Sequence, residues 1–323
     1  MDAAPGSLSA DDRLKAAIIL VVLLVDMVWI WQAGYTFDPT SLVRPLIVVT
    51  LLLAVAELYR RWRPNPVFVV MTREVAWLVA FSVAGAVLST LVITLDLPPI
   101  DDKLAMLDRA LGFDWPGFYA HVTSSRALGL AFSLLYFLAL PLIAFAVIGL
   151  SVMERTDRAS ELVLAAMIGA LVATAISGAF PSSGALAYFR PDEAGLAHTP
   201  VVTLAYKQGF FDLRNGIVSH FSIDGIKGLI AFPSYHATLN VIVLLAFRGL
   251  PKFFWPLFVL TVAMLATTPV EGGHHLADAL GGAVLACASV ALAALWRNRL
   301  GLDRPHSFRN GMNSASVSPS RAT

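Results

Sequence analysis

The sequence has little charge and a single cysteine. Only 14% of its 323 residues are Asp, Glu, Lys or Arg, whereas 57% are hydrophobic, and its mean hydropathy is +0.72. A soluble domain carries about 25% charged residues. The composition therefore indicates a multi-span membrane protein whose surroundings are the lipid bilayer. Because Cys287 is the only cysteine, a disulfide framework and a thiolate metal site are excluded.

The chain also lacks a dense basic stripe. Its net charge is only +1, and its Lys and Arg residues are scattered between apolar runs. A nucleic-acid-binding protein gathers such residues on one face to neutralise phosphates. We therefore expect no nucleic-acid partner.

Apolar runs long enough to cross the hydrocarbon core as helices follow one another along the chain. They predict an all-α integral membrane protein of about eight transmembrane helices. Residues 1–15, which no secretory cleavage pattern follows, are expected to form a cytoplasmic tail, and 297–323 a disordered cytoplasmic tail. The eight predicted spans are 16–34, 42–58, 74–95, 127–150, 161–179, 229–247, 253–269 and 275–296.

The distribution of basic residues predicts the orientation. If the amino terminus is cytoplasmic, 15 of the 23 Lys and Arg lie in cytoplasmic segments, most clearly in the short loop 59–63. This is the positive-inside bias of membrane proteins. It predicts a multi-pass protein of the plasma (inner) membrane, with residues 180–228 and 271–282 on the extracytoplasmic side.

The segment 271–282 opens the last predicted span and contains a histidine and a carboxylate four residues apart. His274 and Asp278 are predicted to share a helical face. A carboxylate that holds one ring nitrogen leaves the other free to attack an electrophile or to move a proton. Gly272 and Gly273 would let the backbone approach an anion such as phosphate, which helix starts favour. Alternatively, His274 merely pairs with Asp278 at the membrane boundary.

A second helix start lies near the beginning of the sixth predicted span. Pro233 and Ser234 are residues typical of helix starts, so the free N–H groups beyond them form another potential anion site. His236 lies in the first turn of this helix. By the span count it is on the same side of the membrane as His274, so two histidines at two helix starts face one compartment.

Two polar segments are expected on this outer side. Residues 180–228 carry too many aromatic residues for a solvated linker and predict a folded cap over the site. In this cap, Arg190 and Arg214 are the cations expected to grip a phosphate, because guanidinium matches its oxygens bidentately. Residues 96–125 predict an amphipathic helix on the outer leaflet, with its acids as a solvated face. Asp26, within the first span, is expected to have an interhelical hydrogen-bonding partner.

The motif Pro233-Ser234-Tyr235-His236, followed a span pair later by Gly273-His274 and Asp278, resembles the type-2 phosphatidic acid phosphatase superfamily. The likeness is closest to the inositol phosphorylceramide synthase (inositolphosphotransferase)-like branch and covers roughly residues 100–296. It implies a six-helix catalytic core within 74–296, with the two spans in 16–73 as an addition. It further implies metal-independent phosphoryl transfer, with no cofactor, through a phosphohistidine.

The resemblance also implies the roles of individual residues. The catalytic residues would be the nucleophile His274, its orienting carboxylate Asp278 and the general acid His236. The phosphate-binding residues would be Ser234, Tyr235, Gly273, Arg190 and Arg214.

The chain departs from the usual motifs of this superfamily at two cations. Ser183 stands at the position of the expected lysine, and Thr267-Thr268 replaces a Ser-Arg pair. The cap cations that are candidates to replace them are Arg190, Arg214, Lys207 and Lys227.

Three functions remain open at this stage. The leading hypothesis is an enzyme that takes a phosphoryl or phosphoalcohol group from a membrane lipid, at the outer face, to water or an alcohol. A transporter is suggested by Asp26 and the polar loop, although it would need ionisable residues in several spans. A metal-dependent intramembrane hydrolase would use Glu271, His274, His275 and Asp278, although adjacent histidines point about 100° apart on a helix.

Overall fold

Long apolar helices dominate the computed structural model, which describes residues 9–225 and 228–300. Within these residues, seven helices are long and apolar enough to cross a membrane, so the chain is an all-α, multi-pass membrane protein. They are α1 (Ala10–Gln32), η1 with α2 (Pro39–Leu42 and Val43–Arg61), α3 with η2 (Pro66–Leu91 and Val92–Leu95), α6 (Arg126–Val152), α7 (Thr156–Ala179), α11 (Pro251–Glu271) and α12 (Leu276–Arg299).

Two of these helices begin earlier than predicted because polar residues cap them. The side chain of Ser9 accepts a hydrogen bond from the Asp12 backbone, so α1 begins at Ala10 instead of residue 16. Asn65 caps α3 in the same way, and that helix begins at Pro66 instead of residue 74. The rest of the predicted amino-terminal tail, residues 1–8, lies outside the described residues, as do residues 301–323 of the predicted carboxy-terminal tail.

The sixth predicted span, 229–247, contains a much shorter helix, α10 (Tyr235–Ala246), of 12 residues. Pro233 and Ser234 delay its start, and the side chain of Ser234 accepts a hydrogen bond from the Ala237 backbone. Helices α6, α7, α11 and α12 surround α10, and nine of its residues are buried. Irregular backbone before such a helix is tolerated because protein, rather than lipid, surrounds it.

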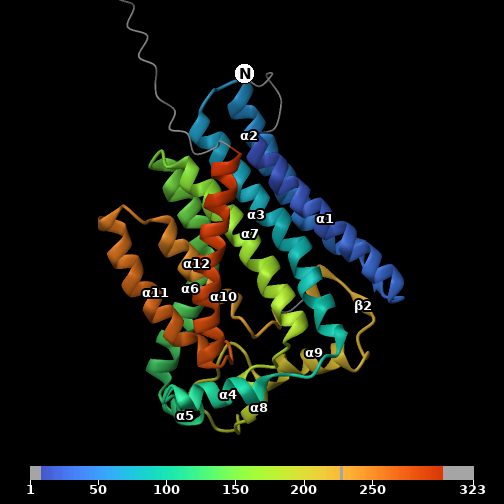
Figure 1. Ribbon diagram of the computed structural model, residues 1–323, viewed down its shortest axis with the longest axis vertical. Helices are drawn as coiled ribbons and strands as arrows, with labels where there is room; N and C mark the ends of the chain where they lie inside the picture. The colour runs from blue at the N-terminus through green and yellow to red at the C-terminus, as the bar shows by residue number, and fades with distance from the viewer. Residues whose placement is uncertain (1–8, 226–227, 301–323) are drawn as a thin grey trace, which may run out of the picture.

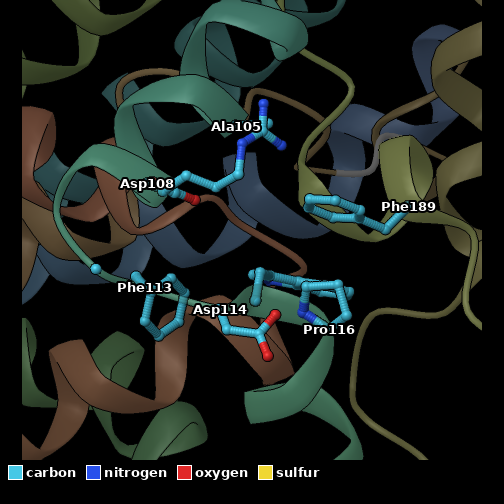
Figure 2. Close-up of a pocket in the computed structure, with 9 residues that line it drawn as sticks. Ala105, Asp108, Phe113, Asp114, Pro116 and Phe189 are labelled. Atoms are coloured by element: carbon cyan, nitrogen blue, oxygen red, sulfur yellow. The ribbon is translucent and has the colours of Figure 1, made fainter.

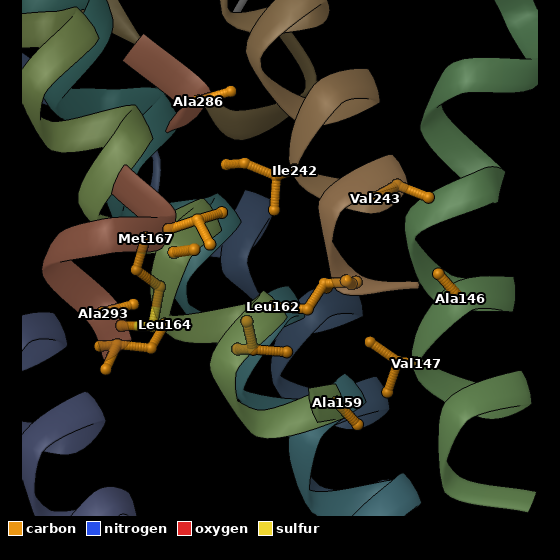
Figure 3. Packing of buried hydrophobic residues seen from close by; sticks show 14 of the residues in the cluster. Ala146, Val147, Ala159, Leu162, Leu164, Met167, Ile242, Val243, Ala286 and Ala293 are labelled. Carbon is orange, nitrogen blue, oxygen red and sulfur yellow. The ribbon is translucent and has the colours of Figure 1, made fainter. Parts of the chain in front are cut away.

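The main apolar core holds α7 and α10 together with their neighbours. Figure 3 shows Leu162, Leu164 and Met167 of α7 in one apolar cluster with Ile242 of α10 and Ala286 of α12. Because these helices are fixed against one another, their ends form a rigid platform. At the edge of the bundle, α1 and α2 pack on α3 (Figure 1).

Both ends of the described chain lie at one end of the bundle, at the top of Figure 1. There Arg297, near the end of α12, contacts Asp11 of α1 at 3.3 Å. Lys15 is fully buried beside them, with its Nζ 2.6 Å from Glu74 and 2.7 Å from Ser160. The described chain therefore starts and ends at the same level of the bundle.

Asp26 differs from the prediction. It continues the buried stripe of α1 formed by Ile19 and Val22 and is only 4% exposed. Within the described part of the chain, neither of its carboxylate oxygens accepts a hydrogen bond. The predicted partner is wrong because the neighbouring stretch of α3 presents apolar side chains, among them Phe81 and Val87.

The other end of the bundle, at the bottom of Figure 1, carries short elements. The segment 180–228, predicted to be a folded cap, contributes helices and a strand in its described part. The strands β1 and β2 pair in parallel with Thr36 opposite His220, which ties the α1–α2 connection to the cap. The elements at this end are α4 (Asp101–Ala110), α5 (Trp115–Thr123), α8 (Ala185–Phe189), α9 (Leu204–Arg214), β1 (Thr36–Phe37), β2 (His220–Phe221) and η3 (Ile223–Gly225).

Candidate active site

The turn between α11 and α12 carries His274 and depends on two glycines. Gly273 has φ +64°, and a Cβ on it would lie 2.8 Å from the Cβ of Leu186. A Cβ on Gly272 would lie 2.5 Å from the ring of His274 itself. Glycine is therefore required at both positions, and the tight turn brings His274 back under the cap.

His274 and Asp278 meet, but not on one helical face. His274 lies before the start of α12, and Asp278, in the first turn, reaches back to it. Its Oδ2 accepts a hydrogen bond from the His275 backbone at 2.9 Å and lies 3.2 Å from Nδ1 of His274. His274 is 6% exposed and Asp278 is fully buried. The predicted shared face is thus wrong, because helix capping joins the pair.

This contact determines which nitrogen of His274 is reactive. A carboxylate only accepts hydrogen bonds, so Nδ1 carries the proton and Nε2 keeps its lone pair. Ser234 Oγ lies 3.4 Å from Nε2. Burial lowers the pKa of His274 and outweighs the opposing effect of Asp278, while nearby Lys207 lowers it further. Neutral His274 with a free Nε2 is suited to nucleophilic attack.

The start of α10 is joined closely to α12 at this point. The backbone N–H of Ser234 donates to the carbonyl of Asp278 at 3.0 Å, and Thr238 Oγ1 donates to the carbonyl of Gly282 at 3.0 Å. A Cβ on Gly282 would lie 2.3 Å from the carbonyl oxygen of Ser234. The starts of α10 and α12, which the sequence predicted as two potential anion sites, therefore form one site. The hydroxyl of Tyr235 instead donates to Ala166 of α7 at 2.9 Å, which leaves its backbone N–H as its link to this site.

His236 lies in the first turn of α10, stacked on Tyr136 of α6. The ring centroids are 4.1 Å apart and the planes 4° from parallel. His236 and His274 are close enough to interact electrostatically. Within the described residues, Nε2 of His236 is buried without a hydrogen-bonding partner. The stacking thus fixes a ring whose nitrogen is available to a ligand.

The two arginines predicted to grip phosphate are engaged elsewhere. Arg190 is exposed after α8, where its Nε donates to the carbonyl of Ala187 and its guanidinium lies over Phe211. Arg214 pairs with Asp96 at 2.7 Å. In the part of the chain that the structure describes, no hydrogen bond or ion pair joins either guanidinium to the histidines. Lys227, the fourth cap cation, lies outside the described residues.

The cap cation placed beside His274 is Lys207 of α9, which is 2% exposed. Its Nζ lies 3.0 Å from the point that a Cβ on Gly184 would occupy, and its Cε 3.6 Å from that of Gly273. Burial lowers the pKa of Lys207 to about 8, against the effects of Asp278 and Asp101. The sequence contained a signal for this position, because Lys207 lies on the apolar face of α9 that includes Phe210.

Two carboxylates of α4 bind the backbone segments next to His274. Asp101 and Asp108 were expected on a solvated face, but they are only 5% and 2% exposed, so this prediction is wrong. Asp108 accepts hydrogen bonds from the first N–H groups of α12 at 2.8 and 3.1 Å and lies 3.1 Å from His275 Nδ1. Asp101 accepts from the Ser183 and Gly184 backbone. The carboxylates are buried because they satisfy these donors.

His275 lies next to the same two carboxylates, Asp101 and Asp108. Burial would lower its pKa, but Asp101 and Asp108 raise it to about 9. Trp115 of α5 adds a further tie, because its Nε1 donates to the carbonyl of His274 at 3.0 Å. An open pocket of about 460 Å³ is lined in part by Asp108 and Trp115. Figure 2 labels Ala105, Asp108, Phe113, Asp114, Pro116 and Phe189 around this pocket.

A second buried histidine cluster lies next to the glycine turn. Glu271, at the end of α11, contacts His198 Nε2 at 2.9 Å, and accepts hydrogen bonds from Ser133 Oγ at 2.9 Å and from the Val201 backbone at 3.0 Å. Ser133 and Glu271 approach the same nitrogen of His198, whereas a nucleophilic triad uses both ring nitrogens. The cluster therefore clamps the cap loop onto α11 immediately before α9.

Among the described residues, no three His, Cys, Asp or Glu side chains are grouped so that they could hold a metal ion. Nδ1 of His275 lies 3.1 Å from Asp108, whereas Nδ1 of His274 lies 3.2 Å from Asp278, so the two rings have different carboxylate partners.

Comparison with protein families gives one match. A family model described as the PAP2 superfamily matches residues 102–292, which is more than half of the chain and includes both histidines, Ser234, Asp278 and Lys207. The comparisons with curated proteins and with solved structures returned no match.

Proposed function

Because the chain belongs to the PAP2 superfamily, we propose that it is a lipid phosphatase or phosphotransferase, in which His274 accepts a phosphoryl or phosphoalcohol group from a membrane lipid. The observation that carries this proposal is the contact of His274 Nδ1 with Asp278 at 3.2 Å, which leaves Nε2 free toward Ser234. The membership itself supports a phosphatase-type activity, and the long apolar helices support a lipid as the source of the group.

In the first half-reaction, the lone pair on Nε2 of His274 attacks phosphorus. A P–N bond forms, the bond from phosphorus to the lipid oxygen breaks, and His236 donates a proton to that leaving oxygen. Asp278 stabilises the positive charge that develops on the His274 ring. Ser234 and the first N–H groups of α10, which lack acceptors within the helix, receive the charge on the phosphoryl oxygens, and the Gly273 backbone lets them approach.

In the second half-reaction, an acceptor hydroxyl attacks phosphorus and the P–N bond breaks. His236, now neutral, takes the proton from the acceptor, and His274 regains its lone pair. Water as the acceptor makes the protein a phosphatase. An alcohol makes it a phosphotransferase, which the resemblance to the inositol phosphorylceramide synthase-like branch favours.

The site belongs on the extracytoplasmic side of the plasma membrane in this proposal. The supporting observation is that the basic loop 59–63 and the ends of the described chain lie opposite the cap, as the positive-inside bias requires. We include α10 as an eighth crossing within a core of residues 74–296, to which α1 and α2 are an addition. In intact cells of a Cys287→Ser background, a cysteine introduced within 184–225 should react with a membrane-impermeant thiol reagent, whereas one at 60–63 should not. The reverse labelling pattern would place the site in the cytoplasm.

The activity is tested by incubating the purified protein with a panel of lipid phosphates, with and without an alcohol acceptor. The expected products are free phosphate or a new phosphodiester, with turnover that survives a chelator. His274→Asn should abolish turnover, whereas the matched control His121→Asn, at an exposed histidine of α5, should not. Failure to release or transfer phosphorus from any of these lipids, or a fully active His274→Asn protein, would contradict the proposal.

A further inference from the structure

The molecule buries a cation that its described fold does not neutralise. Lys207 is 2% exposed, yet it forms no ion pair or side-chain hydrogen bond with any residue of the described ranges 9–225 and 228–300. By contrast, Lys15, which is also buried, lies within 2.8 Å of two carboxylates, Asp11 and Glu74. Burying an ammonium without a counter-ion is costly, so such a group calls for an anion that joins it.

The nearest carboxylates form no ion pair with Lys207, although one oxygen of Asp278, Oδ1, has no hydrogen-bonding partner in the described part of the chain. Asp278 holds His274 and the His275 backbone through one oxygen. Asp101 accepts hydrogen bonds from Ser182 and from the backbone of Gly184. Both act on Lys207 electrostatically, but neither lies within ion-pair distance of its Nζ. Since no carboxylate of the described residues lies at ion-pair distance from Lys207, a direct ion pair requires an anion from outside them.

The position of Lys207 indicates where this anion would lie. Its side chain passes between the loop that follows α7 and the glycine turn, as shown by the close approach of Nζ to Gly184 and of Cε to Gly273. A Cβ on Gly184 would also lie 2.6 Å from the carbonyl oxygen of Gly273, so glycine at this position lets the two loops approach each other closely beside Lys207. The ammonium also acts electrostatically on His274, the proposed nucleophile.

We propose that Lys207 binds a phosphoryl oxygen of the substrate directly and is the main cation of this site. The inference rests on the proposed function and deepens it, because it assigns the cap a binding role. An ammonium is a compact charge with three donors, suited to one or two oxygens of a tetrahedral phosphate. Since α9 carries Lys207 and the Glu271–His198 cluster holds the loop before α9, the cap is part of the phosphate site rather than only a cover.

The test measures the binding of inorganic phosphate by calorimetry, separately from turnover. Lys207→Met should weaken phosphate binding about 100-fold or more, which is the order of effect of losing a single charged donor in a preorganised site. Lys207→Arg should retain most of the binding. Lys103→Met, at an exposed lysine of α4, should bind as the unaltered protein does.

The pH dependence separates binding from a merely structural role. The groups that act on Lys207 are Asp101 of α4, Asp278 of α12 and His274 of the glycine turn. Burial lowers the pKa of Lys207 to about 8 when no phosphate is bound. Phosphate binding should therefore weaken as the pH rises through 8, because the ammonium loses its proton. Lys207→Arg, which stays charged, should lose this dependence.

Two outcomes would overturn the inference. One is that Lys207→Met and the unaltered protein bind phosphate with equal affinity. The other is that Lys207→Arg keeps the pH dependence of the unaltered protein. The second result decides the question even if Lys207→Met fails to fold. Phosphoenzyme formation in the unaltered protein is scored independently. If it is absent while phosphate still binds through Lys207, the proposed reaction fails and the binding site stands.

Discussion

Replacing Asp278 with Asn removes a charge from the site while keeping its hydrogen bonds. The amide oxygen can take the place of Oδ2, which accepts from the His275 backbone and lies 3.2 Å from His274 Nδ1. The amide nitrogen then takes the place of Oδ1, which has no hydrogen-bonding partner in the described part of the chain. His274 therefore stays oriented, and the variant isolates the electrostatic role of Asp278.

The magnitude follows from the distance. Two unit charges 3.2 Å apart interact by about 5 kcal/mol at an effective dielectric constant of about 20. Because the charges spread over the ring and the carboxylate, we expect Asp278→Asn to raise the barrier to phosphohistidine formation by about 3–5 kcal/mol. This corresponds to a rate that is roughly 10²–10⁴-fold lower.

The assay is single-turnover formation of the phosphoenzyme in detergent, together with the thermal unfolding temperature. Asp108→Asn is the matched control, because Asp108 caps the same helix start through His275 and the backbone without contacting His274. It should lower stability by about 1 kcal/mol and slow the reaction less than about tenfold. Equal losses of rate in both variants, or an Asp278→Asn rate within tenfold of the unaltered one, would refute the reasoning.

Three further predictions concern the surroundings of His274. His236→Ala should retain far more activity on a nitrophenyl phosphate than on a lipid, because a good leaving group needs little protonation and the general acid contributes about 10²–10⁴-fold. If the nitrophenyl phosphate restores the activity of the His274 variant instead, His236 is the nucleophile and His274 the general acid. Gly273→Ala should lower the unfolding temperature and the activity together, because φ is +64° and the new Cβ meets Leu186; a variant as stable as the unaltered protein would contradict the strained turn. Glu271→Gln should raise KM more than it lowers kcat in steady-state assays, because it loosens the clamp on His198; an effect on kcat alone would be unexpected.

The sequence predicted the class of fold because apolar length directly reports membrane helices. It predicted a helix start at Pro233 and Ser234 but also a full span over 229–247, because that run is mostly apolar. Its helix begins only at Tyr235, and the burial of nine residues depends on four neighbouring helices that a local pattern does not contain. Long spans are thus readable from composition, whereas an enclosed helix depends on its packing partners.

The candidate site could be predicted only in part from the sequence, for a similar reason. The spacing of His274 and Asp278 indicated a pair, but helix capping rather than a shared face joins them. Asp108 was misread as solvated, because its partners at the start of α12 lie more than 160 residues away in sequence. The arginines were favoured over Lys207 on chemical grounds, yet burial on the apolar face of α9 brings the lysine to the site.

The measurement that tests the central claim most directly is identification of the residue that carries phosphorus during turnover. The protein is mixed with a radiolabelled lipid phosphate, quenched with base within milliseconds, digested and analysed by mass spectrometry at alkaline pH, where phosphohistidine survives. We predict phosphorus on His274, in an intermediate that disappears on addition of the acceptor and is not formed by His274→Asn. Rapid turnover without a labelled protein, or phosphorus carried by His236 or Ser234, would contradict the account.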